Sequence, residues 1–199
     1  RASQAVQAEI ERGLVAQAEA VASDVNKLMY GRLQTAATWS HLEVMQDLQV
    51  NDVDKRLSGF LQRLQLGYAG LYRRLQASNL QGRVVAGSDA AAIGLPVVPA
   101  PVWQSVALAG DTLVLEGPAE AQAGAAPEVT IRIAVVSAFG AGQLGDLRLG
   151  VDWGQIDRVL DEAADNGRML ALLDAQGRLV AGSQRVRAAL PRWSREMAA

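Results

Sequence analysis

The sequence predicts an α+β fold in which a long N-terminal helix precedes an antiparallel sheet of about five strands, and a second hairpin begins a smaller sheet. Three observations lead to this prediction. The N-terminal part is free of proline and has helical periodicity. Runs of apolar, β-branched and aromatic residues follow, separated by turns rich in glycine and proline. One motif of eight residues occurs twice.

The first predicted element is a single helix from Ser3 to Leu48, because no proline occurs before Pro96. Apolar or small residues recur along it in steps close to three, four and seven: Leu14, Ala18, Val21, Val25, Leu28, Trp39 and Leu42. At ~1.5 Å per residue this helix would span roughly 69 Å, more than a compact domain of this size needs. We therefore expect part of it to project as a stalk or to pair with another helix; the alternative is a helix lying along its own domain.

A shorter second helix is expected next, because Asn51-Asp52 offers an N-cap and Gly67 a stop. Its apolar face would consist of Val53, Leu57, Phe60, Leu61 and Leu64. After Gly67 the pattern becomes typical of strands. The strand candidates are Tyr68–Leu75, Arg83–Ser88, Thr112–Leu115, Val129–Ser137 and Asp146–Val151.

Three connecting segments complete the first part of the chain. The segment from Gly94 to Pro101 contains three prolines and is expected to be irregular. Glu116–Pro127 is rich in glycine, alanine and proline and should form an exposed loop. A helix is expected from Trp153 to Asn166, with Asp152 as its cap.

The repeated motif is the most informative feature of the sequence. Gln81–Ser88 recurs 95 residues later as Gln176–Ser183, with seven of eight positions identical. Each copy follows an apolar strand candidate, so the repeat predicts a duplicated β-hairpin with a glycine in its turn. After Ser183 only 16 residues remain, and those around Val186–Met197 look helical. The second copy is therefore either truncated or reduced to a hairpin and a helix.

Composition excludes several functions. The formal net charge is −2, from 19 basic and 21 acidic residues, which is not the basic bias that nucleic-acid binding needs. The chain has no cysteine, and its single histidine, His41, falls on the first helix. These residues assemble neither a catalytic constellation nor a metal site, and we expect no cofactor. The sequence thus predicts that this chain is not itself an enzyme.

These features resemble the double-Cache sensor domains of bacterial membrane receptors. The resemblance depends on the order of an apolar strand, a turn glycine, a strand ending in serine, a glycine bend, a tryptophan and a final Gly-apolar-Asp-apolar strand end. The matching residues are Leu71–Asn79, Gly82, Val84-Val85, Ser88, Gly94, Trp103 and Gly150–Trp153. The family resemblance covers nearly the whole chain.

The resemblance implies a stalk helix followed by a PAS-like antiparallel Cache module and a second, truncated or reduced PAS-like module. The implied limits are 1–66 for the helices, 67–166 for the membrane-distal module and 167–199 for the incomplete membrane-proximal module. It also implies the extracytoplasmic, periplasmic part of an inner-membrane receptor, flanked by transmembrane helices. The apolar stripe on the long first helix adds the expectation of a dimer through that helix. Among receptor classes, sensor histidine kinases match best; diguanylate cyclases and chemotaxis receptors are the alternatives.

The resemblance further implies a small-molecule site formed by Tyr72, Arg74, Trp103 and Asp152. Two readings of Trp103 stay open, core residue or pocket wall, and Asp152 could equally cap the following helix. Members that bind amino acids carry an arginine two residues before this tryptophan and an aromatic residue after it. Pro101 and Gln104 stand there instead. We therefore expect a neutral or cationic ligand more than a free amino acid.

A second function from a different class remains open at this point. The same fold could serve as a dimerisation or protein-binding module without any ligand. A cavity between the sheet and the segment Pro96–Ala109 would favour ligand binding, whereas a filled core there would favour the alternative.

Overall fold

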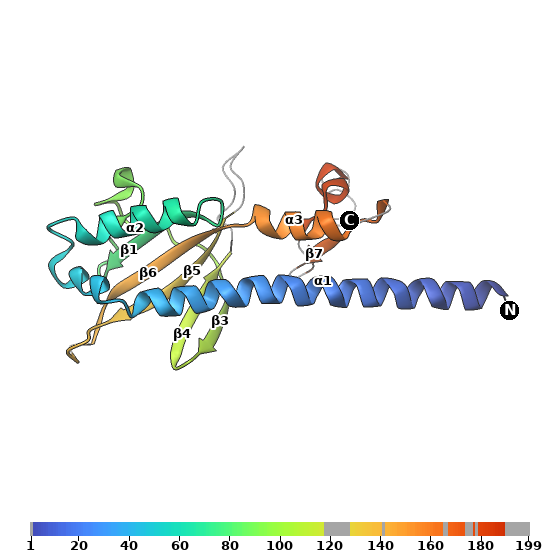
Figure 1. Ribbon diagram of the computed structural model, residues 1–199, viewed down its shortest axis with the longest axis horizontal. Helices are drawn as coiled ribbons and strands as arrows, with labels where there is room; N and C mark the ends of the chain where they lie inside the picture. Colours follow the sequence, from blue (N-terminus) through green and yellow to red (C-terminus); the bar gives the residue numbers. More distant parts are fainter. Residues whose placement is uncertain are drawn as a thin grey trace. The chain divides into compact units, whose positions relative to one another are not determined.

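The computed structural model describes residues 2–117, 128–140, 142–164, 167–173, 177 and 179–189. The chain divides into two compact parts. We call Gly31–Trp153 the sheet unit, and Arg1–Tyr30 together with Gly154–Ala199 the hairpin unit. Helices and antiparallel strands make up both units, which confirms the predicted α+β class (Figure 1).

Helix α1 runs from Ala2 to Ser40 and is shorter than predicted. After it the chain forms a 3₁₀ helix, η1, at Glu43–Val50. Leu42, Met45 and Leu48 explain the change, because they contribute to the core at a spacing of three residues. A 3₁₀ helix has three residues per turn, so it turns all three toward the core, which a continued α-helix would not do.

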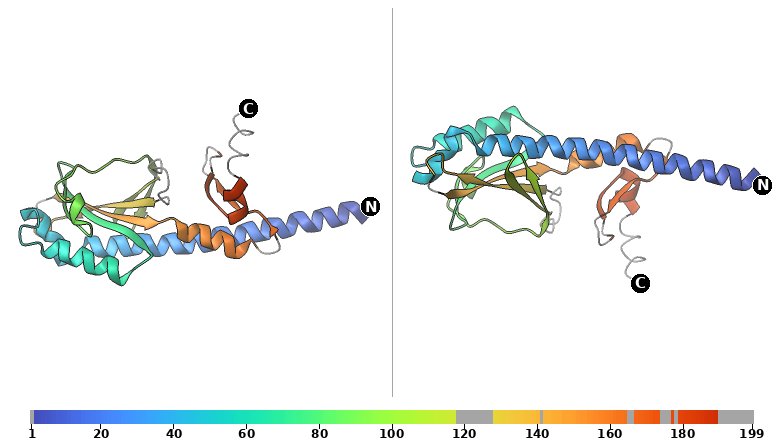
Figure 2. Two further views of the ribbon diagram at one scale, coloured as in Figure 1. Left: turned by 90° about the horizontal axis from the view of Figure 1, so that it is seen from above. Right: turned by 90° about the horizontal axis from the view of Figure 1, so that it is seen from below.

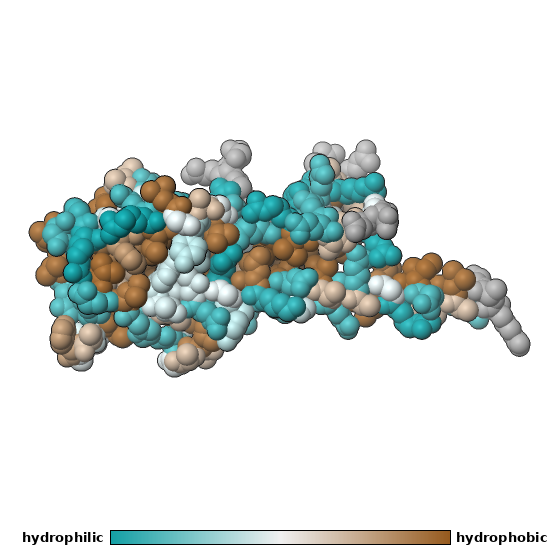
Figure 3. All heavy atoms as spheres, in the orientation of Figure 1, coloured by the Kyte–Doolittle hydropathy of each residue, from teal (hydrophilic) through white to brown (hydrophobic). Residues whose placement is uncertain are grey.

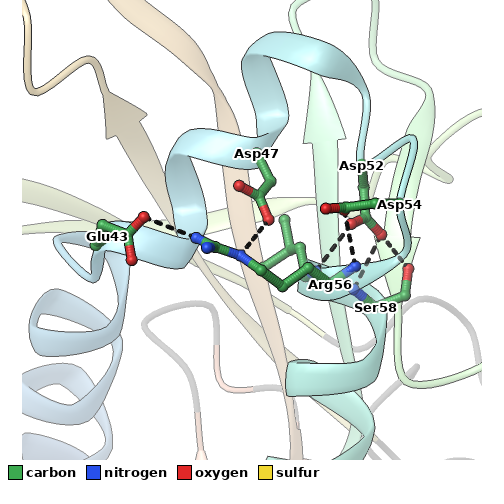
Figure 4. Close-up of polar contacts among 7 residues, drawn as sticks. Glu43, Asp47, Asp52, Asp54, Arg56 and Ser58 are labelled. Atoms are coloured by element: carbon green, nitrogen blue, oxygen red, sulfur yellow. Dashed lines mark hydrogen bonds and ion pairs between the residues drawn. The ribbon is translucent and has the colours of Figure 1, made fainter.

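Helix α2 spans Arg56–Gly67, and the Asp52 side chain bonds the backbone of its first turn. The Asp52 carboxylate accepts hydrogen bonds from the backbone N–H groups of Leu57 and Ser58 at 2.8 and 2.9 Å (Figure 4). These donors have no partner within the helix, so the Asp52 side chain satisfies them as a cap does. The N-cap residue itself, however, is Lys55, so the predicted cap position at Asn51-Asp52 was wrong. Leu57 and Leu61 are fully buried, but Val53 lies before the helix and is 77% exposed, so its assignment to the apolar face was wrong.

The sheet unit holds one antiparallel sheet of six strands in the order β2-β1-β6-β5-β4-β3. The strands are β1 Tyr72–Asn79, β2 Val84–Gly87, β3 Val102–Leu108, β4 Asp111–Glu116, β5 Glu128–Val136 and β6 Gln143–Asp152. The predicted strands correspond to five of these, with the first shifted from Tyr68–Leu75 to Tyr72–Asn79. Strand β3 is additional. It occupies an edge of the sheet directly after the proline-rich segment.

The sheet has one apolar and one polar face, because successive side chains of a strand point in opposite directions. The apolar face packs against α1, η1 and α2 to form the core of this unit. Seen from above and from below, α1 and α2 lie on one side of the sheet, and the chain between β2 and β3 passes over the other (Figure 2). Fully or almost fully buried strand residues include Leu75, Ile131, Ile133, Leu147 and Leu149.

The hairpin unit contains α3 (Gly154–Ala163), β7 (Ala171–Leu173), β8 (Leu179–Gly182) and a helical turn at 184–189. The pairing of β7 with β8 repeats that of β1 with β2 residue for residue. Ala171 pairs with Gly182 as Gln76 pairs with Gly87, and both hairpins carry a bulge at the equivalent position. The turn glycines Gly82 and Gly177 also agree, with φ angles of 70° and 77°. The duplicated hairpin is confirmed.

One expected helix is shorter than predicted, and two expected segments lie mostly outside the described residues. The helix expected to reach Asn166 ends at Ala163. Most of the loop expected at Glu116–Pro127, namely 118–127, lies outside the described residues, as does the expected C-terminal helix beyond residue 189.

The apolar stripe of α1 is largely covered within the chain itself. Val21 and Val25 are each 8% exposed, and Gln17 donates a hydrogen bond of 2.6 Å to the Ala163 carbonyl at the end of α3. Residues in the middle of the predicted stripe therefore pack inside their own protomer. The exposed large aliphatic side chains of α1 lie nearer the N-terminus, at Val6, Ile10, Leu14 and Val15.

Candidate functional site

The polar face of the sheet gathers charged side chains from its central strands. From Glu128 to Ile133 on β5 and from Asp146 to Asp152 on β6, every second residue is polar or glycine, whereas the residues between them are apolar and buried. Arg74 of β1, Gly150 of β6 and Thr130 of β5 occupy neighbouring positions in one row across the sheet. In the adjoining row, Gln76 lies beside Arg148.

Ion pairs connect the charges on this face. Glu116, whose side chain is only 6% exposed, bonds Arg132 at 2.8 Å and also bonds Arg148. Arg74 bonds Glu128 at 2.8 Å. Asp146 lies 3.9 Å from Arg132. Three arginines thus face three carboxylates, so the face carries no net charge when all six are ionised.

Burial affects these charges. It lowers the pKa of the Arg148 guanidinium, against the attraction of Glu116. It also raises the pKa of the Asp146 carboxyl, against the opposing effect of Arg132 and Arg148. Burial is the largest cause of both shifts, in agreement with side-chain exposures of 11% for Arg148 and 22% for Asp146.

A hollow lies on this face, beneath the segment that connects β2 and β3. Its volume is about 30 Å³, close to the space that one water molecule takes in the liquid. We call it the sheet hollow, and its lining residues are Arg74, Gln76, Val97, Val98, Thr130, Arg148 and Gly150. The hollow lies under the start of the predicted covering segment Pro96–Ala109, but it is small.

Arg74 is the one predicted site residue that lines the sheet hollow. Tyr72 points to the opposite face of the sheet, where its ring packs 5.5 Å from Trp39. The cause is a bulge between Tyr72 and Arg74, because Tyr72 pairs with Val151 and Arg74 with Gly150. Two residues that regular alternation would place on one face therefore lie on opposite faces.

Trp103 and Asp152 also lie outside the lining of the hollow. Trp103 packs edge-on against Trp153 with ring centroids 5.8 Å apart, and covers Gly117 so closely that any side chain there would collide with the indole. The Asp152 carboxylate bonds the guanidinium of Arg73 at 3.2 Å. A cation of the chain itself therefore already pairs with the carboxylate that a cationic ligand would use.

A group of three acidic residues, Asp47, Asp52 and Asp54, has the spacing of a cation site (Figure 4). Its oxygens already have partners. Asp52 caps α2, and Asp47 bonds Arg56 at 2.9 Å. The Arg56 guanidinium also bonds Glu43. We therefore assign this group to the start of α2 and not to a metal.

A more open groove of about 410 Å³ lies where the end of η1 meets the β1–β2 and β5–β6 turns. Carboxamides such as Gln49, Asn79 and Gln81 line it, and Phe139 beside them is 84% exposed. Open turns form this groove, whereas five of the seven residues that line the sheet hollow lie on paired strands. We therefore take the sheet hollow as the candidate site.

The sequence matches no protein-family model and no curated protein significantly. The fold, however, is that of bacterial sensor domains. The sensor domain of the Vibrio cholerae histidine kinase DctB superposes with a TM-score of 0.66 at 14% identity, covering 94% of this chain and 70% of that one. The ligand-binding domain of the Pseudomonas fluorescens chemoreceptor CtaA in complex with L-serine gives 0.63 at 15% identity, covering 90% and 75%. The Escherichia coli DcuS sensor domain gives 0.52 at 12% identity, covering 67% and 95%.

These likenesses confirm the predicted fold, in which a long helix is followed by an antiparallel sheet, as in these sensor domains. Among the residues that the structure describes, no helix is long and apolar enough to cross a membrane.

Proposed function

We propose that this chain is the extracytoplasmic ligand-sensing region of a bacterial membrane receptor and binds a small molecule in the sheet hollow. The observation that carries the proposal is the sensor-domain fold, shared with DctB over 94% of the chain, combined with a polar sheet face that bears the hollow. Catalysis belongs to other parts of such a receptor. A histidine kinase is the output that we favour, with a diguanylate cyclase or chemotaxis receptor as alternatives.

The lining of the hollow suits a neutral, polar ligand. Gln76 and Thr130 can each donate and accept hydrogen bonds, and the arginines already have carboxylate partners. A cationic ligand, which the sequence also suggested, would meet Arg74 and Arg148 and is disfavoured. We keep Trp103 and Asp152 as residues that support the site from its margin.

Room for a ligand would come from the segment over the hollow. The backbone N–H of Val97 donates to the Gly82 carbonyl at 2.8 Å, and Pro101 accepts from Gly117 at 2.7 Å. Between these two ties lies Val98, whose side chain is 74% exposed although it lines the hollow. Outward movement of residues 98–100 would enlarge the hollow without breaking the paired strands.

A thermal-shift screen of neutral polar metabolites tests the proposal. A ligand at 100 times its Kd adds ~2.7 kcal/mol of stability, which a small domain reports as a rise of several degrees in Tm. We expect at least one chemical class to give such a rise in the wild-type protein. A stabilising compound whose effect survives changes at Thr130 and Gln76 would place the site elsewhere.

In the receptor, we propose a parallel dimer through the N-terminal part of α1, flanked by transmembrane helices that the sequence shown does not include. Hydrophobic residues gather on this part of the helix (Figure 3). Val6, Ile10 and Leu14 follow one another at four-residue steps and are 60%, 58% and 48% exposed. Such a row is costly to leave in water, and a second copy would cover it. The module limits 67–166 and 167–199 belong to the same proposal.

The small volume of the hollow supports a second candidate, a module that responds to a protein partner without a ligand. Filling the hollow distinguishes the two functions. Thr130→Trp places a large side chain in a space of about 30 Å³. It should abolish signalling by a ligand-binding receptor that still folds, and leave a ligand-free module active.

A further inference from the structure

We infer that Glu128 acts as a built-in carboxylate ligand of Arg74 and thereby excludes acidic molecules from the sheet hollow. This inference rests on the proposed function, since it assigns the specificity of the same site. It makes Glu128 a specificity-determining residue, although Glu128 itself is not among the residues that line the hollow.

The geometry places the carboxylate where an anion would otherwise bind. Glu128 is the first residue of β5 and Arg74 lies on β1, with β6 between these strands. The Glu128 side chain crosses β6 directly above Gly150. A Cβ atom at Gly150 would lie 2.5 Å from Glu128 Cδ and 2.7 Å from both carboxylate oxygens. Because glycine has no Cβ, position 150 leaves room for the Glu128 side chain to reach Arg74, whose Nε donates to Glu128 Oε1 at 2.8 Å.

The exposures of the two partners show that the contact is directed inward. The Glu128 side chain is 16% exposed and the Arg74 side chain 50%. A carboxylate that reached outward to a surface arginine would remain largely in water. Glu128 instead lies across the sheet and gives up most of its hydration.

An anionic ligand would have to displace this carboxylate. Glu128 is tethered beside Arg74, so it competes at the high effective concentration of an intramolecular partner. Once displaced, it would be left mostly buried without its cation, which is costly. The second arginine in the lining offers no alternative, because Glu116 already holds Arg148 in a more buried pair. Neutral ligands avoid both penalties.

The Arg74–Glu128 ion pair contributes little to the stability of the fold. An ion pair with one half-exposed partner contributes only ~0–1 kcal/mol. Removing the carboxylate should therefore leave the protein folded, which makes its effect on ligand choice measurable.

Acetate is the direct probe, because it reproduces the missing carboxylate in Glu128→Ala. The measurement is an NMR titration of the Arg74 Nε–H signal with sodium acetate, against sodium chloride at equal ionic strength. Asp47→Ala is the matched control, because Asp47 is an 18% exposed carboxylate paired with the 46% exposed Arg56. Both variants remove the same charge and a similar ion pair.

We expect acetate to bind at Arg74 of Glu128→Ala at least tenfold more tightly than in the wild-type protein, and Asp47→Ala to behave like the wild type. Affinities within twofold in all three proteins, or an equal gain in Asp47→Ala, would overturn the inference. The result does not depend on the natural ligand. Failure of the metabolite screen with a positive acetate result would count against the proposed function alone, and the reverse outcome against the role of Glu128 alone.

Discussion

Ser183 and Leu170 hold each other by two hydrogen bonds: the Ser183 N–H donates to the Leu170 carbonyl at 2.8 Å, and the Leu170 N–H donates to Ser183 Oγ at 3.1 Å. Ser88 and Leu75 make the same two bonds at 2.8 and 3.0 Å, 95 residues earlier. The repeat in the sequence thus preserves a specific device. The serine hydroxyl substitutes for a strand partner where the second strand of each hairpin has ended.

The first prediction concerns this device in the sheet unit. Ser88→Ala should destabilise the protein by about 1–2 kcal/mol, because it leaves the N–H of fully buried Leu75 without its acceptor. The exposed Ser105→Ala on edge strand β3 is the control and should change little. Urea unfolding midpoints measure both. Equal midpoints for the two variants would show that water replaces the Ser88 hydroxyl as the acceptor of the Leu75 N–H.

The second prediction concerns the cap of α2. Asp52→Ala should cost roughly 2–3 kcal/mol, because it removes a buried acceptor of two helix N–H groups. Exposed Asp54 accepts only the Arg56 N–H, at 3.1 Å, so Asp54→Ala should cost less than half as much. If addition of Ca²⁺ raised the Tm of the wild type but not of Asp52→Ala, our assignment of these carboxylates to the helix start would be wrong.

The third prediction uses the pH dependence of Asp146. Burial raises the pKa of its carboxyl in the folded state, so the charged form lowers stability at pH values above that raised pKa. The cost disappears as pH falls through the raised pKa toward the ordinary value of 3.8. Asp146→Asn should therefore be more stable than the wild type at pH 7, and the difference should shrink on acidification. Denaturation series at several pH values would measure the difference in unfolding free energy between the variant and the wild type. A difference that grows on acidification would contradict the prediction.

The fourth prediction separates the two parts of the α1 stripe. Ile10 is 58% exposed and Val21 is 8% exposed. Ile10→Glu should leave unfolding unchanged and weaken self-association, as followed by sedimentation equilibrium. Val21→Glu should instead destabilise the hairpin unit by roughly 2–4 kcal/mol, because it buries a charge without a partner. Loss of self-association in Val21→Glu alone, with normal stability, would contradict this division.

Much of the fold follows from local patterns in the sequence. The hairpins were predictable because Gln81–Ser88 and its copy contain both the turn glycine and the closing serine. Edge strand β3 was not predictable in the same way. It follows three prolines, and residues such as Val102, 59% exposed, lack the clean alternation that a core imposes.

The site was predicted less well, for a specific physical reason. A bulge between Tyr72 and Arg74 reverses the face to which Tyr72 points, and no residue type marks that bulge. The charged face did leave a signal. Glu128, Thr130 and Arg132 alternate with apolar residues, which indicates a strand with one apolar and one polar face.

The most direct test of the sensing claim is the affinity of a ligand found in the screen for two variants of the hollow. Thr130→Val and Gln76→Leu remove hydrogen-bonding groups from the lining while nearly keeping their volume, and Thr112→Val on β4 is the exposed control. Calorimetric titration should show a loss of at least about tenfold for each lining variant, or ~1.4 kcal/mol, and none for the control. Affinities within twofold of the wild type for both lining variants would contradict the assignment of the sheet hollow as the sensing site.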